Sequence, residues 1–103
     1  MATISVTNTN TTQTLDVCLS SWGSNESTAY ATIAPNQTHD FTRTDPRGFV
    51  MMVRNGSSGQ ALPYYVLAGD AITASSATSV TDNGVRLQTI ARNQQLTSTA
   101  SGT

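Results

Sequence analysis

Short runs in which polar and apolar residues alternate make up most of the chain, and turn sequences separate them. In residues 3–8 the apolar side chains are Ile4 and Val6, and residues 14–20 and 85–89 alternate in the same way. Because successive side chains of a strand point to opposite faces, this period of two predicts strands with one buried face. About eight such runs recur at roughly 8–12-residue spacing, and no segment keeps the 3.6-residue period of a helix.

These runs predict an all-β fold, an antiparallel β-sandwich of about eight short strands in a largely up-and-down order. A chain of 103 residues is long enough for one domain with a single thin core. We expect residues 1–103 to form that domain, with residues 93–103 as a frayed tail. Residues 3–8 and 14–20 are expected to pair as a hairpin across the polar loop between them.

Turn sequences set the boundaries of the strands. Residues 45–48, Asp-Pro-Arg-Gly, fit a type I turn in which Pro46 fixes φ at the second position. Residues 48–54, the longest apolar run, are expected to follow as a strand with both faces at least partly covered. The Asn-Gly pairs at 55–56 and 83–84 predict hairpins, because these residues adopt the positive φ angles of tight turns. Pro63 confines the next strand to a sheet edge, since proline has no N–H to donate to a neighbour.

The composition excludes several classes of partner. Only 11% of the residues are charged, the net charge is −1, and all five basic residues are arginines. Nucleic-acid binding requires a basic patch, so we expect no nucleic-acid partner. No apolar run approaches the length of a membrane span, and no signal peptide follows Met1.

No catalytic or metal-binding motif stands out in the sequence. The single His39 has no ligand-type partner at a useful spacing, and the six acidic residues are scattered singly along the chain. The nucleophile motif of serine hydrolases is missing, and the lone Cys18 reads as a small buried residue. We therefore expect neither enzymatic activity nor a metal or other cofactor.

The aromatic residues in or near loops point to a binding site. Trp22, the only tryptophan, lies in a Ser- and Gly-containing loop where it can serve as a stacking platform. Sugars place their CH faces on aromatic rings and their hydroxyl groups against Asp, Asn and Arg. The candidate carbohydrate-binding residues are Trp22, Arg43, Asp45, Arg47, Asn55, Tyr64 and Tyr65. The alternative is structural: Trp22 caps the core, while Arg43 and Arg47 pair with Asp40 and Asp45.

In length and composition, as a short, Lys-free, Thr- and Asn-rich chain with loop aromatics, the sequence resembles small lectins of the slime-mould haemagglutinin type. That resemblance implies a sandwich similar to a reduced legume lectin, which binds glycoproteins without catalysis. The metal cluster of legume lectins does not appear in this sequence, so no metal or sugar ligand is carried over. A second resemblance, to aegerolysin-type proteins, rests on Ser20-Ser21-Trp22-Gly23 and implies lipid recognition at a membrane surface.

The sequence thus favours a non-enzymatic, lectin-like protein that recognises the glycans of glycoproteins and becomes multivalent as a homo-oligomer. We expect it outside the cell or at the cell surface, with the cytoplasm as the alternative. A lipid-binding sandwich and a structural protein-interaction module remain the alternative functions.

Overall fold

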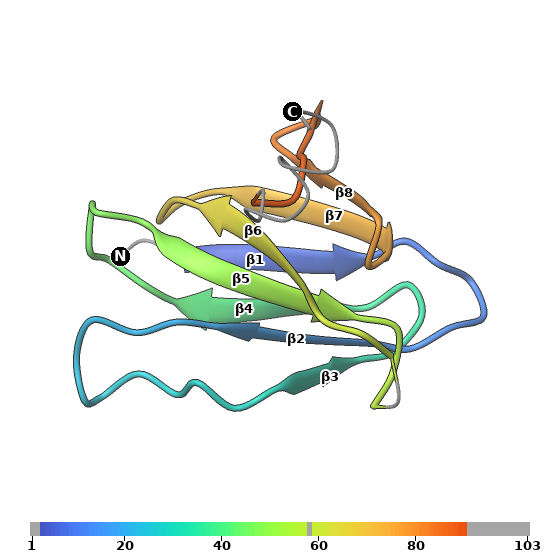
Figure 1. Ribbon diagram of the computed structural model, residues 1–103, viewed down its shortest axis with the longest axis horizontal. Helices are drawn as coiled ribbons and strands as arrows, with labels where there is room; N and C mark the ends of the chain where they lie inside the picture. Colours follow the sequence, from blue (N-terminus) through green and yellow to red (C-terminus); the bar gives the residue numbers. More distant parts are fainter. Residues whose placement is uncertain (1–2, 58, 91–103) are drawn as a thin grey trace, which may run out of the picture.

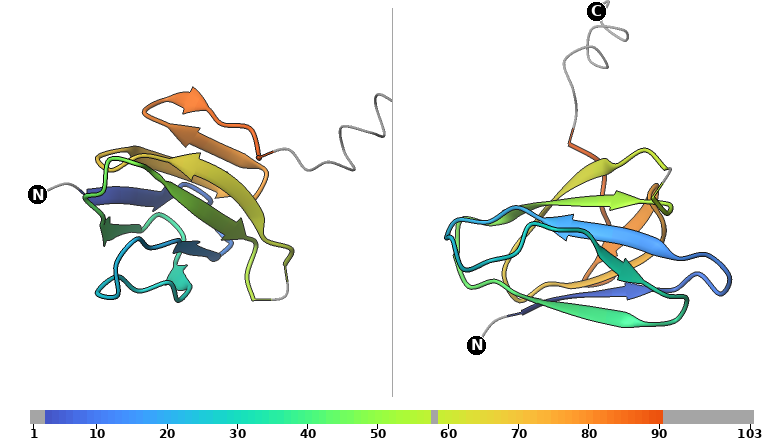
Figure 2. Two further views of the ribbon diagram at one scale, coloured as in Figure 1. Left: turned by 60° about the vertical axis from the view of Figure 1, so that its left-hand side comes forward. Right: turned by 90° about the horizontal axis from the view of Figure 1, so that it is seen from below.

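The computed structural model describes residues 3–57 and 59–90, which form nine β-strands in two sheets packed against each other (Figure 1). The strands are β1 (Thr3–Asn8), β2 (Leu15–Leu19), β3 (Ala31–Ile33), β4 (Thr38–Thr42), β5 (Phe49–Arg54), β6 (Leu62–Val66), β7 (Ala71–Ser76), β8 (Ser79–Asp82) and β9 (Val85–Arg86). The first sheet has the order β4-β1-β7-β8-β9 and the second has the order β3-β2-β5-β6. In the right-hand view of Figure 2, β5 and β6 of the second sheet lie at the top, and β1 and β4 of the first sheet lie at the bottom. The predicted all-β sandwich is confirmed.

The core lies between the two sheets and is made by the apolar side of each alternating strand. Ile4 and Val6 of β1 are buried, and so are Phe49, Met51 and Val53 of β5. Burying one such side chain contributes about 1.5–3 kcal/mol relative to leaving it exposed. This burial explains why the alternating pattern identified the strands correctly.

The strand order differs from the expected up-and-down arrangement. β1 and β2 do not form a hairpin, because β1 belongs to the first sheet and β2 to the second. Both strands carry an apolar face, and placing them in opposite sheets lets both faces meet in the core. Instead, β1 pairs with β4 in antiparallel and with β7 in parallel orientation, so the sandwich is not wholly antiparallel.

The side chain of Asn8 fixes the crossing from β1 to β2. Asn8 is fully buried, and its Nδ2 donates to the carbonyl oxygens of Gln13 and Ile33 at 2.8 and 3.0 Å. Its Oδ1 accepts the backbone N–H of Asn10 at 2.9 Å. These bonds satisfy a buried amide and join the loop to both sheets.

The 45–48 turn, the 83–84 turn and the edge strand agree with the predictions, but the 55–56 turn does not. β5 and β6 do pair as a hairpin, yet residues 55–61 separate them, and Asn55 lacks the positive φ of a tight turn, which of the two residues only Gly56 adopts. Asp45 Oδ1 accepts the backbone N–H of Arg47 at 2.9 Å, and Gly48 follows with a φ of 89°. Asn83 and Gly84 both have positive φ and join β8 to β9. β6, which contains Pro63, is an edge strand.

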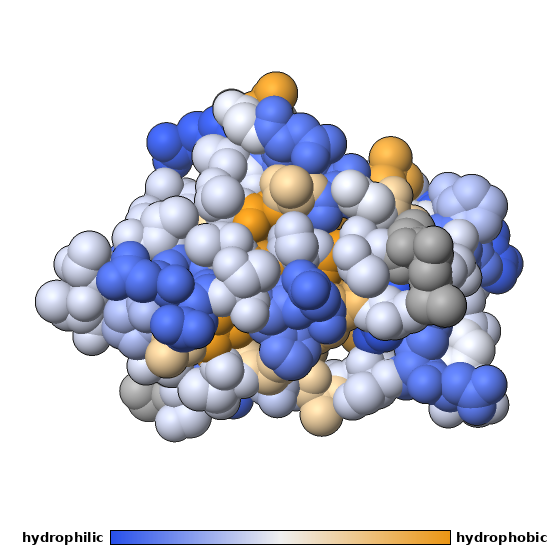
Figure 3. All heavy atoms as spheres, turned by 180° about the vertical axis from the view of Figure 1, so that it is seen from behind, coloured by the Kyte–Doolittle hydropathy of each residue, from blue (hydrophilic) through white to orange (hydrophobic). Residues whose placement is uncertain are grey.

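The outer faces of the two sheets differ in chemistry. A row of threonines crosses the first sheet, in which Thr7 pairs with Thr38 and Thr73, and Thr73 pairs with Thr81. Seen from behind in Figure 3, the molecule is mainly pale blue and white, the colours of weakly polar side chains. The second sheet instead carries an ion pair between Asp16 and Arg54 at 3.0 Å. On the outer face of β5 the cover is incomplete, since Met52 is half-buried and Val50 is exposed.

The predicted tail at 93–103 lies outside the described residues.

Candidate functional site

A pocket of about 290 Å³ opens at one end of the sandwich, where two loops meet the beginning of β5. The loops are the β2–β3 connection and the β4–β5 turn, which lie together at the left of Figure 1. The pocket is lined by Ser20, Ser21, Trp22, Arg47, Gly48, Phe49, Val50 and Tyr65. Three of the predicted binding residues, Trp22, Arg47 and Tyr65, are therefore brought together.

Trp22 is held in place but keeps half of its surface exposed. Its indole Nε1 donates to the carbonyl oxygen of Gly48 at 2.7 Å, and its backbone N–H donates to Glu26 Oε1 at 3.0 Å. The side chain nevertheless remains 50% exposed. Trp22 is thus an aromatic side chain that hydrogen bonds hold in place and that remains half exposed at the surface.

Arg47 lies on the indole of Trp22 and is fixed from the other side by Asp45. Its Cζ is 3.6 Å from the centre of the Trp22 ring, a cation–π contact. Its Nε and Nη2 donate to the two carboxylate oxygens of Asp45 at 3.0 and 2.7 Å. These bonds lower the pKa of Asp45 to about 2 and raise the pKa of Arg47. The predicted pairing of Arg47 with Asp45 is confirmed.

Tyr65 forms the other aromatic wall of the pocket. Its hydroxyl group donates to the carbonyl oxygen of Arg47 at 2.6 Å, and the side chain is 53% exposed. The phenol ring lies so close to Gly48 that a Cβ at position 48 would overlap it. Gly48 therefore serves two purposes: it adopts the positive φ of the turn and leaves room for Tyr65.

Arg43 lies in the interior beneath the loops rather than on the pocket wall. Only 4% of it is exposed, and its guanidinium donates to the carbonyl oxygens of Ser20, Thr42 and Ser27 at 3.2, 3.1 and 2.6 Å. The carboxylate of Glu26 is 4.0 Å away, so the acid beside Arg43 is Glu26 rather than the expected Asp40. Arg43 thus supports the loop that carries Trp22 and does not face the pocket.

Asn55 and Tyr64 lie away from the pocket and both bind Ala77. Asn55 follows the far end of β5, where its Oδ1 accepts the backbone N–H of Ala77 at 2.8 Å. Tyr64 is buried and donates its hydroxyl group to the Ala77 carbonyl oxygen. Burial raises the pKa of Tyr64. Asn55 and Tyr64 were predicted to contact a sugar, but in the structure their polar groups form hydrogen bonds within the protein.

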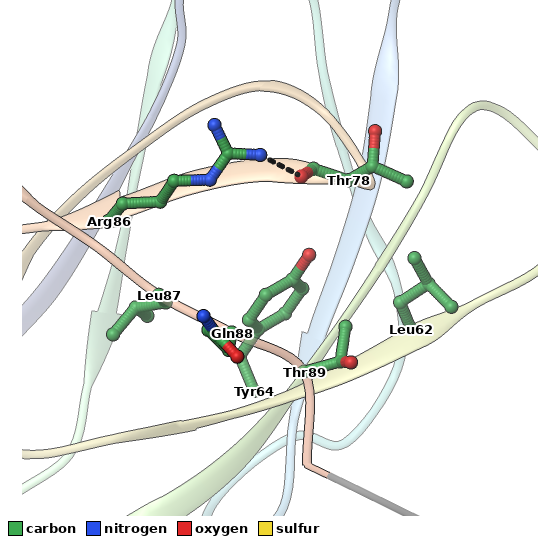
Figure 4. A pocket seen from close by; sticks show the side chains of 7 residues that line it. All are labelled: Leu62, Tyr64, Thr78, Arg86, Leu87, Gln88 and Thr89. Atoms are coloured by element: carbon green, nitrogen blue, oxygen red, sulfur yellow. Dashed lines mark hydrogen bonds between the residues drawn. The ribbon is translucent and has the colours of Figure 1, made fainter. Parts of the chain in front are cut away.

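Tyr64 borders a second cavity, of about 330 Å³, shown in Figure 4. Its other lining residues are Leu62, Thr78, Arg86, Leu87, Gln88 and Thr89. Arg86 bridges part of it by donating from Nη2 to the Thr78 carbonyl oxygen at 3.4 Å. Of the predicted binding residues, Tyr64 alone lines this cavity.

The prediction missed the parts of the pocket that are not aromatic or charged. Ser20 Oγ accepts the backbone N–H of Val50 at 3.0 Å, which ties the tryptophan loop to β5. Val50 is exposed on the outer face of β5, and its register partner on β6 is Tyr65. The alternation along residues 48–54 carried this signal, because it places Val50 on the face opposite Phe49 and Met51.

Two further kinds of feature would point to a function, a cluster of metal-ligating side chains and a membrane-spanning helix. Residues 3–57 and 59–90 contain no cluster of three or more His, Cys, Asp or Glu side chains that could hold a metal ion. Within the same ranges, no helix is long and apolar enough to cross a membrane.

Comparison of the chain with protein-family models, with characterised proteins and with solved structures finds no match. The site is therefore interpreted from its own geometry.

Proposed function

We propose that this protein binds carbohydrate, recognising glycans of glycoproteins without catalysis, and that the pocket between Trp22 and Tyr65 is its site. The observation that carries the proposal is the way both rings are held. Trp22 and Tyr65 donate their polar hydrogens to consecutive carbonyl oxygens, those of Gly48 and Arg47. Both polar groups are thus satisfied, and about half of each aromatic side chain stays exposed for a ligand.

A sugar ring in this pocket would place its CH face on an aromatic ring and its hydroxyl groups against Arg47 and the Ser20–Ser21 segment. Such a ligand buries little area, so we expect a Kd on the order of millimolar to micromolar for one site. Joining two or more sites in a homo-oligomer raises the avidity by roughly 10²–10⁴. We propose the cell exterior or cell surface as the place where such binding occurs.

The first test is the substitution Trp22→Ala, measured on a glycan array and by calorimetry with the glycans that bind. We expect at least a tenfold loss of affinity, which corresponds to about 1.4 kcal/mol. The melting temperature should fall by only a few degrees, because half of Trp22 is exposed in the folded protein. Trp22→Phe is the matched control, since it keeps an aromatic ring but loses the hydrogen bond to Gly48. Unchanged affinity in Trp22→Ala would contradict the assignment of the site.

A second candidate function is binding to the surface of a lipid membrane. Three exposed hydrophobic residues that line the same pocket favour it: Trp22, Val50 and Tyr65. Tryptophan and tyrosine suit the boundary between water and hydrocarbon, because each has an apolar body and a polar tip. Co-sedimentation with phosphatidylcholine vesicles tests this function. Binding to vesicles without binding to any glycan would replace the first proposal, and binding to neither would leave a protein-interaction module.

A further inference from the structure

The charge of Arg47 is balanced by Asp45 before any ligand arrives. Both carboxylate oxygens of Asp45 accept hydrogen bonds from the Arg47 guanidinium, and one of them also accepts the Arg47 backbone N–H. The guanidinium group is thus held between an indole ring and a carboxylate. Because the carboxylate comes from the first residue of the same turn, its position is set by the backbone.

The other charged residues near the pocket do not add a net charge to the Arg47–Asp45 pair. Arg43 is buried below the loop and Glu26 lies 4.0 Å from it. The pocket therefore has one cation at its wall, already paired, and a second pair behind it. Among residues 3–57 and 59–90, an anionic ligand in this pocket would find no unbalanced positive charge to bind.

We propose that the pocket selects uncharged sugars over anionic ones, and that Asp45 is the residue that determines this selectivity. The inference rests on the proposed carbohydrate-binding function. A carboxylate or sulfate on the ligand would have to displace Asp45 from Arg47, or lie beside it and meet its negative charge. A hydroxyl group can share the guanidinium with Asp45 at no such cost.

The state of Asp45 makes the selectivity constant under physiological conditions. Its hydrogen bonds to Arg47 lower its pKa to about 2, so the carboxylate is ionised throughout the neutral range. Because the Arg47 side chain is 60% exposed, solvent screens the pair and the effect is modest. We expect a preference of about threefold to tenfold.

The experiment compares each hexose with its own uronic acid, for example galactose with galacturonate and glucose with glucuronate. Each pair differs only at C6, which is a hydroxymethyl group in the hexose and a carboxylate in the uronic acid. The wild-type protein should bind the hexose more tightly by about threefold to tenfold. Asp45→Asn should abolish or reverse this preference, because it releases the charge of Arg47 while preserving the shape of the side chain.

Arg47→Gln is the matched variant, and it should shift selectivity in the opposite direction. Removing the cation leaves Asp45 unbalanced, so discrimination against the uronic acid should increase. If the wild-type protein binds hexose and uronic acid equally, the inference is overturned while the proposed function stands. If no hexose or glycan binds at all, the proposed function itself fails. The wild-type comparison decides between these outcomes even if a variant fails to fold.

Discussion

Gly48 is the residue on which the geometry of the pocket depends most. It supplies the positive φ that ends the 45–48 turn, its carbonyl oxygen anchors Trp22, and its missing side chain leaves room for Tyr65. An alanine at this position would meet two separate obstacles, one in the backbone and one in the neighbouring ring.

We therefore predict that Gly48→Ala costs more stability than Gly84→Ala. Gly84 has nearly the same φ, 86° against 89°, but nothing lies within 4 Å of a Cβ built there. Gly84→Ala should lose about 1–2 kcal/mol from backbone strain alone. Gly48→Ala should lose more and should also weaken glycan binding, because Tyr65 must move. Urea unfolding and calorimetric titration measure the two effects, and equal losses in both variants would contradict the role of Tyr65.

For single residues, the sequence predicts contacts between neighbours in the chain and misses contacts between residues that are far apart in the chain. Asp45 and Arg47 are two residues apart in a recognisable turn, so their pairing follows from turn chemistry. Arg43 was predicted at the site because it is one of only five cations and lies beside the 45–48 turn. Its burial depends on two carbonyl oxygens of the β2–β3 loop, those of Ser20 and Ser27, which reach Arg43 only in the fold, and on the carbonyl oxygen of the neighbouring Thr42. Tyr64 and Tyr65 are adjacent in a strand, so only one of them could face outward, and the sheet register decided which.

At the scale of elements, the pairing of β7 with β8 brings two carboxyl groups together. Asp82, at the end of β8, is in register with buried Ile72, and its Oδ1 is buried without a hydrogen-bond partner among the described residues. Burial, with a smaller contribution from neighbouring Asp70, raises the pKa of Asp82 to about 7. The folded protein therefore holds this proton more tightly than the unfolded chain does.

The sign of the pH dependence follows from that difference. The folded state binds the Asp82 proton between the unfolded pKa of 3.8 and the folded pKa of about 7, while the unfolded chain has already released it. This group thus stabilises the fold below about pH 4, and the contribution is lost as the pH rises towards 7.

We predict that Asp82→Asn removes this part of the pH dependence and is more stable than the wild-type protein at neutral and higher pH. Urea unfolding at about pH 4.5 and about pH 8 measures it. Asp40→Asn is the control, since it removes one carboxylate from the exposed outer face of β4. Parallel pH profiles for the wild-type protein and Asp82→Asn would show that Asp82 titrates normally.

The individual strands could be predicted, but their partners could not. The alternation of Ile4 and Val6 shows that β1 has one apolar face, and such a face fits either layer of a sandwich equally well. A polar loop of the observed length can close a hairpin or cross to the other sheet. In the folded protein the loop crosses, and the side chain of Asn8 donates to carbonyl oxygens on the far side of the crossing, a contact that the alternation pattern does not reveal.

At the scale of the whole molecule, the two ends and the two outer faces differ. The Trp22 pocket lies at one end, while Asn55 and the Ala77 loop lie at the other end of β5. The outer face of the first sheet carries the threonine row, and its hydroxyl groups bond in the pairs Thr7–Thr38 and Thr73–Thr81. These groups hydrate the surface of a chain that has few charges. A homo-oligomer formed through a face or end away from Trp22 would leave its pockets accessible for multivalent binding.

The parallel pairing of β1 with β7 has a consequence for how the chain reaches its fold. β1 occupies an interior position in its sheet, yet one of its two neighbours begins only at Ala71. During synthesis, β1 must therefore remain incompletely paired until β7 has emerged. Contacts between distant segments cost loop-closure entropy before they stabilise anything, and β-proteins rich in them refold in about milliseconds to seconds. We expect the slow step of folding to be the pairing of β1 with β7, because this contact joins segments that lie far apart in the sequence.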